Sequence, residues 1–306
     1  MANIIAVIWD FDKTLVEGYM QDPIFEAYGI KAKDFWDEVN SLPEKYLKDQ
    51  GVKVNPDTIY LNQFIKYTKQ GTFKGLNNKT LREFGKNLKF YEGIPEIFEK
   101  TKKLIEDNKR YKEYNIKVEH YVVSTGITEI IKGSTVYDYV EDVWGCEFIE
   151  DVSPLDENER IISEIGFTID NTTKTRALFE INKGVNKRDN INVNSKVPKD
   201  KRRVPFQNMI YIADGPSDVP AFAVVRKNGG RTFAIYPKDN NKAFKQVEQL
   251  RMDNRIDMYA EADYREGTTT YMWITNKIRD IAERICEEEK HNINSTVSEA
   301  PSHIIE

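Results

Sequence analysis

The chain has 306 residues, of which 40% are hydrophobic and 11% aromatic, enough for a substantial core in one large domain or two modest ones. Its formal net charge of −5 gives no overall positive field, so we expect neither nucleic acid nor an anionic membrane as a partner. It opens on a core-strand pattern without a charged leader segment, and no apolar run approaches ~18 residues. With two cysteines that lack metal-ligand spacing, these features predict a cytoplasmic protein with reduced thiols.

The first predicted strand, residues 4–9, ends in Asp10, Asp12 and Thr14. The strands of an open α/β sheet present their sites at their carboxyl ends, and residues two apart project to the same side. Two crowded carboxylates repel each other, so they need a cation or a shared proton. The pair suits phosphoryl transfer, in which one carboxylate attacks phosphorus, the other carries a proton and a metal ion screens the charge.

A helical insertion follows this strand. Apolar and aromatic residues recur at helical spacing from about residue 22 to residue 88, and breaks at 51–56 and 71–78 divide the segment into about four helices. We expect residues 17–90 to form a small α-helical domain.

The remaining chain alternates between strand and helix patterns. Further strands are predicted at 118–123, 209–213 and 232–236. This alternation predicts an α/β core, residues 1–16 and 91–286, built on a parallel sheet with helices on both faces. The polar, basic segment 182–207 is expected to be a solvated loop, and residues 287–306 a disordered tail.

The strand at 118–123 is followed by Ser124, Thr125 and Gly126. A hydroxyl group and exposed backbone N–H groups at the start of a helix form an anion site suited to phosphate oxygens. Ser and Thr are also favoured as ordinary helix N-caps, and that alternative remains open.

Lys174 lies where a polar turn enters a predicted helix. A cation there opposes the helix dipole, so a bound anion would explain its presence, although a surface lysine is the simpler reading. Lys183 is the rival, but it precedes Gly184 near a helix end, where lysine is expected for C-capping reasons.

The strand at 209–213 is followed by Asp214, Gly215, Pro216 and, four residues after the first aspartate, Asp218. Asp218 is also an acceptable helix N-cap. Two strands that each end in aspartates, however, supply the hard oxygen ligands that Mg²⁺ prefers.

These four motifs, in this order, resemble those of the haloacid dehalogenase (HAD) superfamily. The signature from Asp10 to Leu15 and the position of the insertion are most similar to the phosphoserine-phosphatase-like branch, as is the return into the core at residues 90–94. Ser217 departs from the pattern, because related phosphatases often carry Asn there. The resemblance implies a Rossmann-like HAD core with a small helical cap, and a Mg²⁺-dependent phosphatase acting on a small phosphomonoester.

The resemblance also implies roles for individual residues. Asp10 would be the nucleophile that forms an aspartyl-phosphate, Asp12 the general acid and then base, and Thr14 would orient their loop. Lys174 would hold the phosphoryl oxygens together with Ser124, Thr125 and Gly126.

The implied metal site combines Asp10, the Asp12 carbonyl and Asp214, and Asp218 would hold a ligand water or Lys174. The cofactor is Mg²⁺.

The insertion is expected to select the leaving group. The candidates are Glu17, Tyr19, Met20, Phe25, Trp36 and Arg82. Glu17 is preferred because it follows the catalytic loop closely, although a solvated hinge residue is an equal alternative. The expected partner is a small phosphorylated metabolite, and the protein is expected to be a monomer or homodimer.

Three other functions share parts of this pattern. A phosphotransferase or mutase would use the same residues, and a catalytically idle Mg²⁺-binding interaction protein is the alternative from another class. A dehalogenase needs no acid at position 12, so Asp12 counts against it.

Overall fold

The computed structural model describes residues 3–297. The strands are β1 (Asn3–Trp9), β2 (Ile116–Ile127), β3 (Asp142–Val152), β4 (Arg160–Phe167), β5 (Met209–Ala213), β6 (Arg231–Tyr236) and β7 (Met258–Glu261). The α-helices are α1 (Asp22–Ala27), α2 (Ala32–Gln50), α3 (Ile59–Lys69), α4 (Asn78–Gly85), α5 (Glu96–Glu106), α6 (Lys109–Glu113), α7 (Thr128–Gly133), α8 (Lys174–Lys183), α9 (Val219–Lys227), α10 (Asn241–Met252) and α11 (Thr269–Val297). The strands form one sheet in the order β4-β3-β2-β1-β5-β6-β7.

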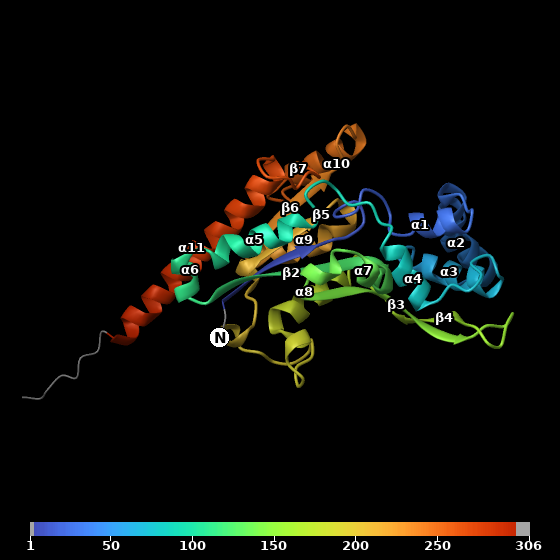
Figure 1. Ribbon diagram of the computed structural model, residues 1–306, viewed down its shortest axis with the longest axis horizontal. Coiled ribbons are helices and arrows are strands. Elements are labelled where there is room, and N and C mark those ends of the chain that lie inside the picture. The colour runs from blue at the N-terminus through green and yellow to red at the C-terminus, as the bar shows by residue number, and fades with distance from the viewer. Residues whose placement is uncertain (1–2, 298–306) are drawn as a thin grey trace, which may run out of the picture.

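Helices cover both faces of this sheet, as predicted (Figure 1). In β1, Ile5, Val7 and Trp9 face one buried cluster, which α5 and α11 complete. Ile4 and Ala6 face a second cluster, which α8, α9 and α10 complete. Because both faces of β1 are buried, its sequence is a continuous apolar run rather than an alternation.

The strands that the sequence predicts pair in parallel, as expected, but the complete sheet is mixed because β4, which was not predicted, is antiparallel. All neighbouring strands pair in parallel except β3 and β4, which are antiparallel. Only residues 153–159 connect these two strands. A parallel return needs a crossover of a dozen or more residues, so this short connection returns the chain as a hairpin.

The helical insertion contains the four expected helices, α1 to α4, with its breaks where the sequence placed them. Its aromatic side chains form a core of their own: the ring centroids of Phe25 and Phe35 are 4.8 Å apart, and those of Phe64 and Phe73 are 5.1 Å apart. Fully burying one such ring contributes about 1.5–3 kcal/mol. The helical spacing of these aromatics therefore serves packing within the insertion.

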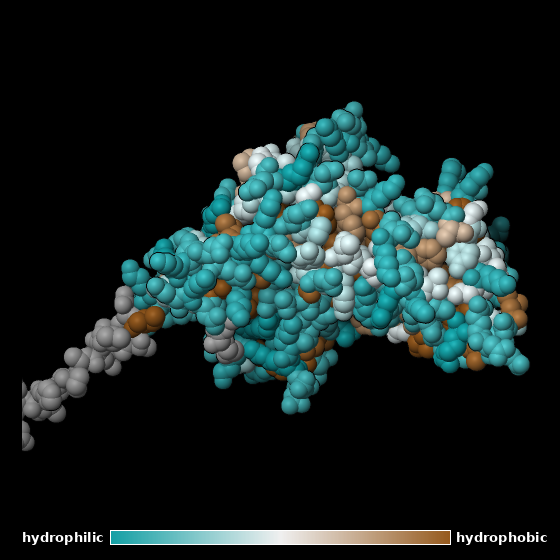
Figure 2. Space-filling model, viewed as in Figure 1, coloured by the Kyte–Doolittle hydropathy of each residue, from teal (hydrophilic) through white to brown (hydrophobic). Residues whose placement is uncertain are grey.

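The insertion also rests on the β3–β4 hairpin, residues 142–167. The Asn78 backbone N–H donates to Glu150 Oε1 at 2.6 Å, and Asn78 Nδ2 donates to the Phe148 carbonyl at 3.2 Å. The Ile162 N–H donates to the Leu76 carbonyl at 3.0 Å. Figure 2 shows a largely hydrophilic face with hydrophobic residues scattered over the core and over the end of the molecule that carries the insertion.

The prediction that residues 287–306 form a disordered tail was wrong for residues 287–297. These residues belong to the C-terminal helix α11. Polar contacts join this part of the helix to the core: Arg110 forms ion pairs with Glu283 and Glu287, each at 2.5 Å, and Asn3 Nδ2 donates a hydrogen bond to Glu289 Oε1 at 3.2 Å. Residues 298–306 of that prediction lie outside the described residues. Within residues 3–297, neither α11 nor any other helix is long and apolar enough to cross a membrane.

The basic segment 182–207 is largely exposed, as expected for a solvated loop, but one of its arginines is anchored to the core. Arg203 donates to both carboxylate oxygens of Glu119, at 2.6 and 2.5 Å, and to the Tyr121 hydroxyl at 2.8 Å. Part of the positive charge in this segment is therefore neutralised within the fold.

Candidate active site

The site lies at the carboxyl ends of β1 and β5, which are adjacent and parallel. Trp9 is opposite Ile212, and the Asp10 N–H donates to the Ile212 carbonyl at 2.9 Å. The register therefore brings Asp10 and Asp214, each the first residue beyond its strand, to the same edge of the sheet.

One buried lysine joins the first, third and fourth motifs. Lys174 is the first residue of α8, and its Nζ lies 2.7 Å from Asp10 Oδ1 and 2.7 Å from Asp218 Oδ1. Its side chain is 1% exposed. Burial alone would lower the pKa of Lys174, but the charges and hydrogen bonds of the two aspartates raise it above its ordinary value. Lys174 is therefore a fixed positive charge between the two carboxylates.

The other oxygen of Asp10 is also held. Thr14 Oγ1 donates to Asp10 Oδ2 at 2.9 Å, and the Tyr264 hydroxyl in turn donates to the Thr14 carbonyl at 2.6 Å. Burial raises the pKa of Asp10, while Lys174 and Thr14 favour its ionised form. Both oxygens of this carboxylate are thus oriented, one by Lys174 from α8 and the other by Thr14 from the loop that carries Asp10.

Asp12 is in a different environment. Its Oδ1 accepts the Met20 N–H at 2.8 Å. Burial, together with the charges of Asp10 and Asp214, raises the pKa of Asp12 well above its ordinary value. Two carboxylates two residues apart therefore differ, since Asp10 has a cationic partner and Asp12 has a neutral donor, as an acid–base pair requires.

Three carboxylates form a cluster that can accept a cation. Oxygens of Asp10, Asp214 and Asp218 lie within 4.8 Å of one another. Burial, followed by the charges of Asp10 and Asp218, raises the pKa of Asp214 to about 7. A hard divalent cation would relieve this repulsion, so the donor set fits Mg²⁺. The Asp12 carboxylate does not belong to this cluster.

Asp218 is the most enclosed member of the cluster. It is 0% exposed, and its Oδ1 accepts the Tyr211 hydroxyl at 2.6 Å in addition to Lys174. Its Oδ2 accepts the Ser217 hydroxyl at 2.9 Å. With its oxygens so engaged, Asp218 is better suited to hold Lys174 than to bind a cation directly. Ser217, the departure from the family pattern, thus contacts this aspartate.

The second motif adjoins these carboxylates from β2. Ser124, Thr125 and Gly126 lie in the irregular end of that strand, where its pairing with β3 shifts register, and the following helix α7 begins only at Thr128. The Gly126 N–H donates to Ser124 Oγ at 2.9 Å. The motif therefore ends immediately before Ile127, the N-cap of α7, and neither Ser124 nor Thr125 is itself that N-cap.

Met20 connects the second motif to Asp12. Its backbone binds Asp12, and its Sδ accepts the Ile127 N–H at 3.0 Å. A Cβ atom at Gly126 would lie 2.1 Å from Met20 Cε, so a larger residue there would displace the flexible end of this side chain. Met20 thereby covers the phosphate-binding segment that the sequence predicts.

Several other predicted residues are not brought to the carboxylates. Glu17 is exposed and lines a pocket of about 260 Å³ at the base of the insertion, and within the described residues no hydrogen bond or ion pair joins its carboxylate to the site. Arg82 pairs with Glu129 at the surface. Phe25 belongs to the core of the insertion. Lys183 is the other candidate for the role of Lys174. It lies at the C-terminal end of α8, and its Nζ donates to carbonyl groups of the 182–207 segment rather than to the site.

Tyr19 and Trp36 contact each other and residues on either side of them. The Tyr19 hydroxyl accepts from Lys13 Nζ at 2.5 Å, and the centroids of the Tyr19 and Trp36 rings are 5.7 Å apart. Trp36 also contacts Tyr60 at 5.8 Å.

Sequence reasoning missed three tyrosines. Tyr60, Tyr211 and Tyr264 each donate a hydroxyl to a site segment, at the Thr125 carbonyl, Asp218 and the Thr14 carbonyl respectively. Each partner is distant in sequence or on another element, so no local pattern signals these contacts.

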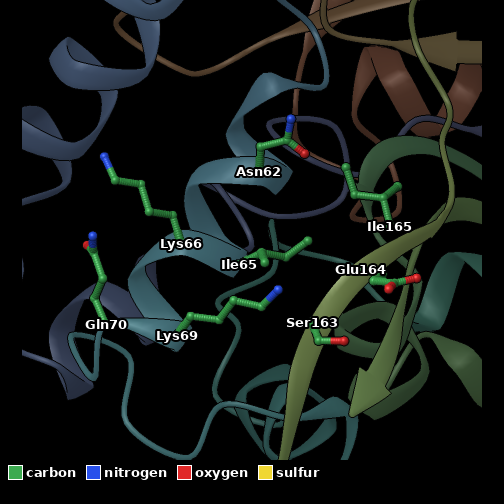
Figure 3. A pocket seen from close by; sticks show the side chains of 8 residues that line it. All are labelled: Asn62, Ile65, Lys66, Lys69, Gln70, Ser163, Glu164 and Ile165. Carbon is green, nitrogen blue, oxygen red and sulfur yellow. The ribbon is translucent and has the colours of Figure 1, made fainter. Parts of the chain in front are cut away.

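A groove of about 550 Å³ lies elsewhere, between α3 and β4 (Figure 3). Its lining residues are Asn62, Ile65, Lys66, Lys69, Gln70, Ser163, Glu164 and Ile165. None of them is a predicted site residue, so the chemistry of the carboxylates is not located in this groove.

Solved structures share this architecture. A probable phosphoserine phosphatase from Vibrio cholerae matches with a TM-score of 0.51 and 11% identity, over 92% of this chain and 67% of its own. A phosphoserine phosphatase in apo form matches with a TM-score of 0.50 and 13% identity, over 87% of this chain and 97% of its own. A HAD family hydrolase from Salmonella enterica serovar Typhi also scores 0.50, with 12% identity over 84% of this chain and 67% of its own. The chain has the HAD fold.

One curated protein is a close sequence relative. An uncharacterized protein of Borreliella burgdorferi is 37% identical over 287 residues, which is 90% of this HAD-fold chain and 97% of the relative. The chain belongs to the same family as this protein. No family model matches the sequence.

Proposed function

We propose that the protein is a Mg²⁺-dependent phosphatase that hydrolyses a small phosphomonoester through an aspartyl-phosphate. The observation that carries this proposal is the pair of 2.7 Å contacts by which buried Lys174 joins Asp10 to Asp218, beside Asp214. A fold gains little stability from burying such a charge cluster, since ion pairs lose hydration when buried. The cluster is therefore better explained by the chemistry it can perform.

In the proposed first step, an Asp10 oxygen attacks phosphorus as the bond from phosphorus to the ester oxygen breaks. Asp12 gives its proton to the departing oxygen, and its raised pKa suits it to hold that proton at neutral pH. In the second step Asp12 takes a proton from water, the water oxygen attacks phosphorus, and the bond to Asp10 breaks. Lys174 would neutralise negative charge on the phosphoryl oxygens, and the Ser124 hydroxyl would orient them by donating a hydrogen bond.

Asp10 and Asp214 would hold Mg²⁺, with the Asp12 carbonyl as a further oxygen ligand, and Asp218 would fix Lys174. The ion would supply charge neutralisation at the transferring phosphoryl group. We further propose that residues 17–90 act as a cap that sets substrate choice, and that the protein works in the cytoplasm on a phosphorylated metabolite.

The test is release of phosphate from a chromogenic aryl phosphate by purified protein, with Mg²⁺ and with chelator, followed by a panel of phosphorylated metabolites. Mg²⁺-dependent release supports the proposal. Binding of Mg²⁺ without hydrolysis of any ester would favour the interaction protein. Transfer of the phosphoryl group to an added alcohol, in preference to water, would favour the phosphotransferase or mutase.

A further inference from the structure

One tyrosine of the helical insertion reaches the phosphate-binding segment of the core. Tyr60, on α3, is 5% exposed, and its hydroxyl donates to the Thr125 carbonyl at 2.8 Å. The Cys146 thiol, from β3, donates to the same oxygen at 3.3 Å. A buried tyrosine hydroxyl needs an acceptor, and this one finds it across the boundary between insertion and core.

The peptide group that accepts this bond continues toward the site. The Thr125 carbonyl and the Gly126 N–H belong to one planar peptide unit. That N–H donates to Ser124 Oγ at 2.9 Å. Ser124 is 1% exposed, and no acceptor for its own hydroxyl hydrogen is found among residues 3–293. A hydroxyl oxygen that already accepts one bond retains its hydrogen for donation.

These contacts form a continuous chain of donors. It runs from the Tyr60 hydroxyl through the peptide unit of Thr125 and Gly126 to Ser124, and its free end is the Ser124 hydroxyl hydrogen. Consecutive hydrogen bonds polarise one another, so a donor at the carbonyl strengthens the N–H bond and makes the serine a better donor. The bonds at both ends of the peptide unit also fix the direction in which Ser124 points.

Tyr60 is held by the packing of the insertion. Its ring contacts Trp36 on α2 at 5.8 Å between centroids and Phe64 on its own helix at 6.0 Å. Its position is thus fixed by packing within the insertion, whereas its acceptor belongs to the core. The bond to Thr125 can exist only when α3 is seated over this part of β2.

We propose that Tyr60 is a positioning residue that couples the seating of the helical insertion to phosphoryl binding by Ser124. The inference deepens the proposed function and depends on it, because it takes Ser124 as a donor to the phosphoryl group. Closure over a substrate then does more than exclude water, since it completes the donor chain that ends at phosphate.

The test is a double-mutant cycle with Tyr60→Phe, Ser124→Ala and the double variant. The probe is inorganic phosphate, whose affinity in Mg²⁺ is measured by titration calorimetry. We expect Tyr60→Phe to weaken phosphate binding about twofold to tenfold, the range for one hydrogen bond. We expect no further weakening when the same change is made in the Ser124→Ala background. A merely structural role for Tyr60 would give the same loss in both backgrounds.

Tyr28→Phe is the matched control. The Tyr28 hydroxyl donates to the Lys74 carbonyl at 2.9 Å, a tyrosine-to-carbonyl bond that stays inside the insertion. This variant should bind phosphate as the wild type does. Cys146→Ala removes the second donor to the Thr125 carbonyl. This variant should weaken phosphate binding less than Tyr60→Phe does, and should not weaken it further in the Ser124→Ala background.

Two results would overturn the inference in distinguishable ways. If Ser124→Ala weakens phosphate binding but Tyr60→Phe does not, or does so equally in both backgrounds, the coupling is refuted while the proposed function stands. If Ser124→Ala binds phosphate as tightly as the wild type, the role of Ser124 in the proposed function fails and the coupling fails with it.

Discussion

Replacing Lys174 by methionine removes the ammonium group that joins Asp10 and Asp218 but keeps the length of the side chain. Three carboxylates then face one another without a cation, and Asp10 and Asp218 are 5% and 0% exposed. Removing one partner of a buried ion pair costs about 3–5 kcal/mol. At about 2–4 °C per kcal/mol for a large domain, we expect the melting temperature in chelator to fall by about 6–20 °C.

The pH dependence of this loss has a defined sign. Burial and mutual repulsion already raise the pKa of Asp214 to about 7, so the folded state binds more protons than the unfolded state between the ordinary aspartate value and about 7. Stability in chelator therefore falls as pH rises through that range. Without Lys174 the carboxyl pKa values rise further, so the variant should lose more stability on raising the pH. The difference in melting temperature between variant and wild type should become smaller as the pH is lowered.

The assay is thermal unfolding followed by circular dichroism, in chelator and in Mg²⁺, at neutral and mildly acidic pH. Mg²⁺ should recover part of the loss because it supplies a cation to the same oxygens. Lys187→Met is the control: Lys187 binds Glu141 at 3.0 Å, with both side chains about one-third exposed, and such pairs contribute about 1 kcal/mol or less. Equal decreases in melting temperature for Lys174→Met and Lys187→Met would refute this reasoning. So would a difference between Lys174→Met and wild type that becomes larger at low pH.

Four further outcomes are expected. Asp10→Asn should abolish turnover with little change in the circular dichroism spectrum, and retention of substantial activity would remove Asp10 as nucleophile. Ca²⁺ should inhibit where Mg²⁺ activates, because a larger ion accepts more oxygen ligands and would misplace Asp10; equal rates with both ions would contradict this. Mg²⁺ affinity should weaken as the pH falls below about 7, since Asp214 must lose its proton to bind, and a pH-independent affinity in calorimetry would exclude that coupling. Replacing residues 17–90 by a short linker should reduce turnover of the preferred metabolite far more than that of an aryl phosphate; equal losses in a folded variant would make the insertion structural support.

The central strands could be predicted because they are buried on both faces. β1 and β5 are almost continuous apolar runs, whereas the neighbouring β2 and β6 each keep a shorter apolar stretch beside polar residues. β3 and β4 were missed because exposed charged residues such as Glu147 and Glu164 interrupt their apolar pattern. Their hairpin faces solvent on one side and the insertion on the other, so its burial depends on tertiary packing.

The placement of the main polar groups could also be read from the sequence. Asp10 and Asp214 follow apolar strands, and the parallel register that brings them together is a general property of such sheets. Lys174 was selected from 45 basic residues by its place at a helix start. Its contact with Asp10, 164 residues away, could not be read from the sequence because it depends on how α8 packs on the sheet.

The contacts of the insertion were beyond sequence reasoning. Glu17 was chosen for its closeness to the catalytic loop, but its backbone N–H binds the Lys89 carbonyl at 3.0 Å and its side chain is exposed. Tyr60 carries no local signal at all, since its role depends on where α3 rests on β2. The alternation of buried and exposed positions shows which residues form a helix, but it does not show which core segment that helix meets.

The central claim is that Asp10 becomes phosphorylated during turnover. The most direct measurement is mass spectrometry of protein quenched in acid while it hydrolyses an aryl phosphate in Mg²⁺. The account predicts one added phosphoryl group on the peptide that contains Asp10, absent in chelator and in Asp10→Asn. Steady hydrolysis with no phosphoryl group on that peptide, or with the group on another residue, would contradict it.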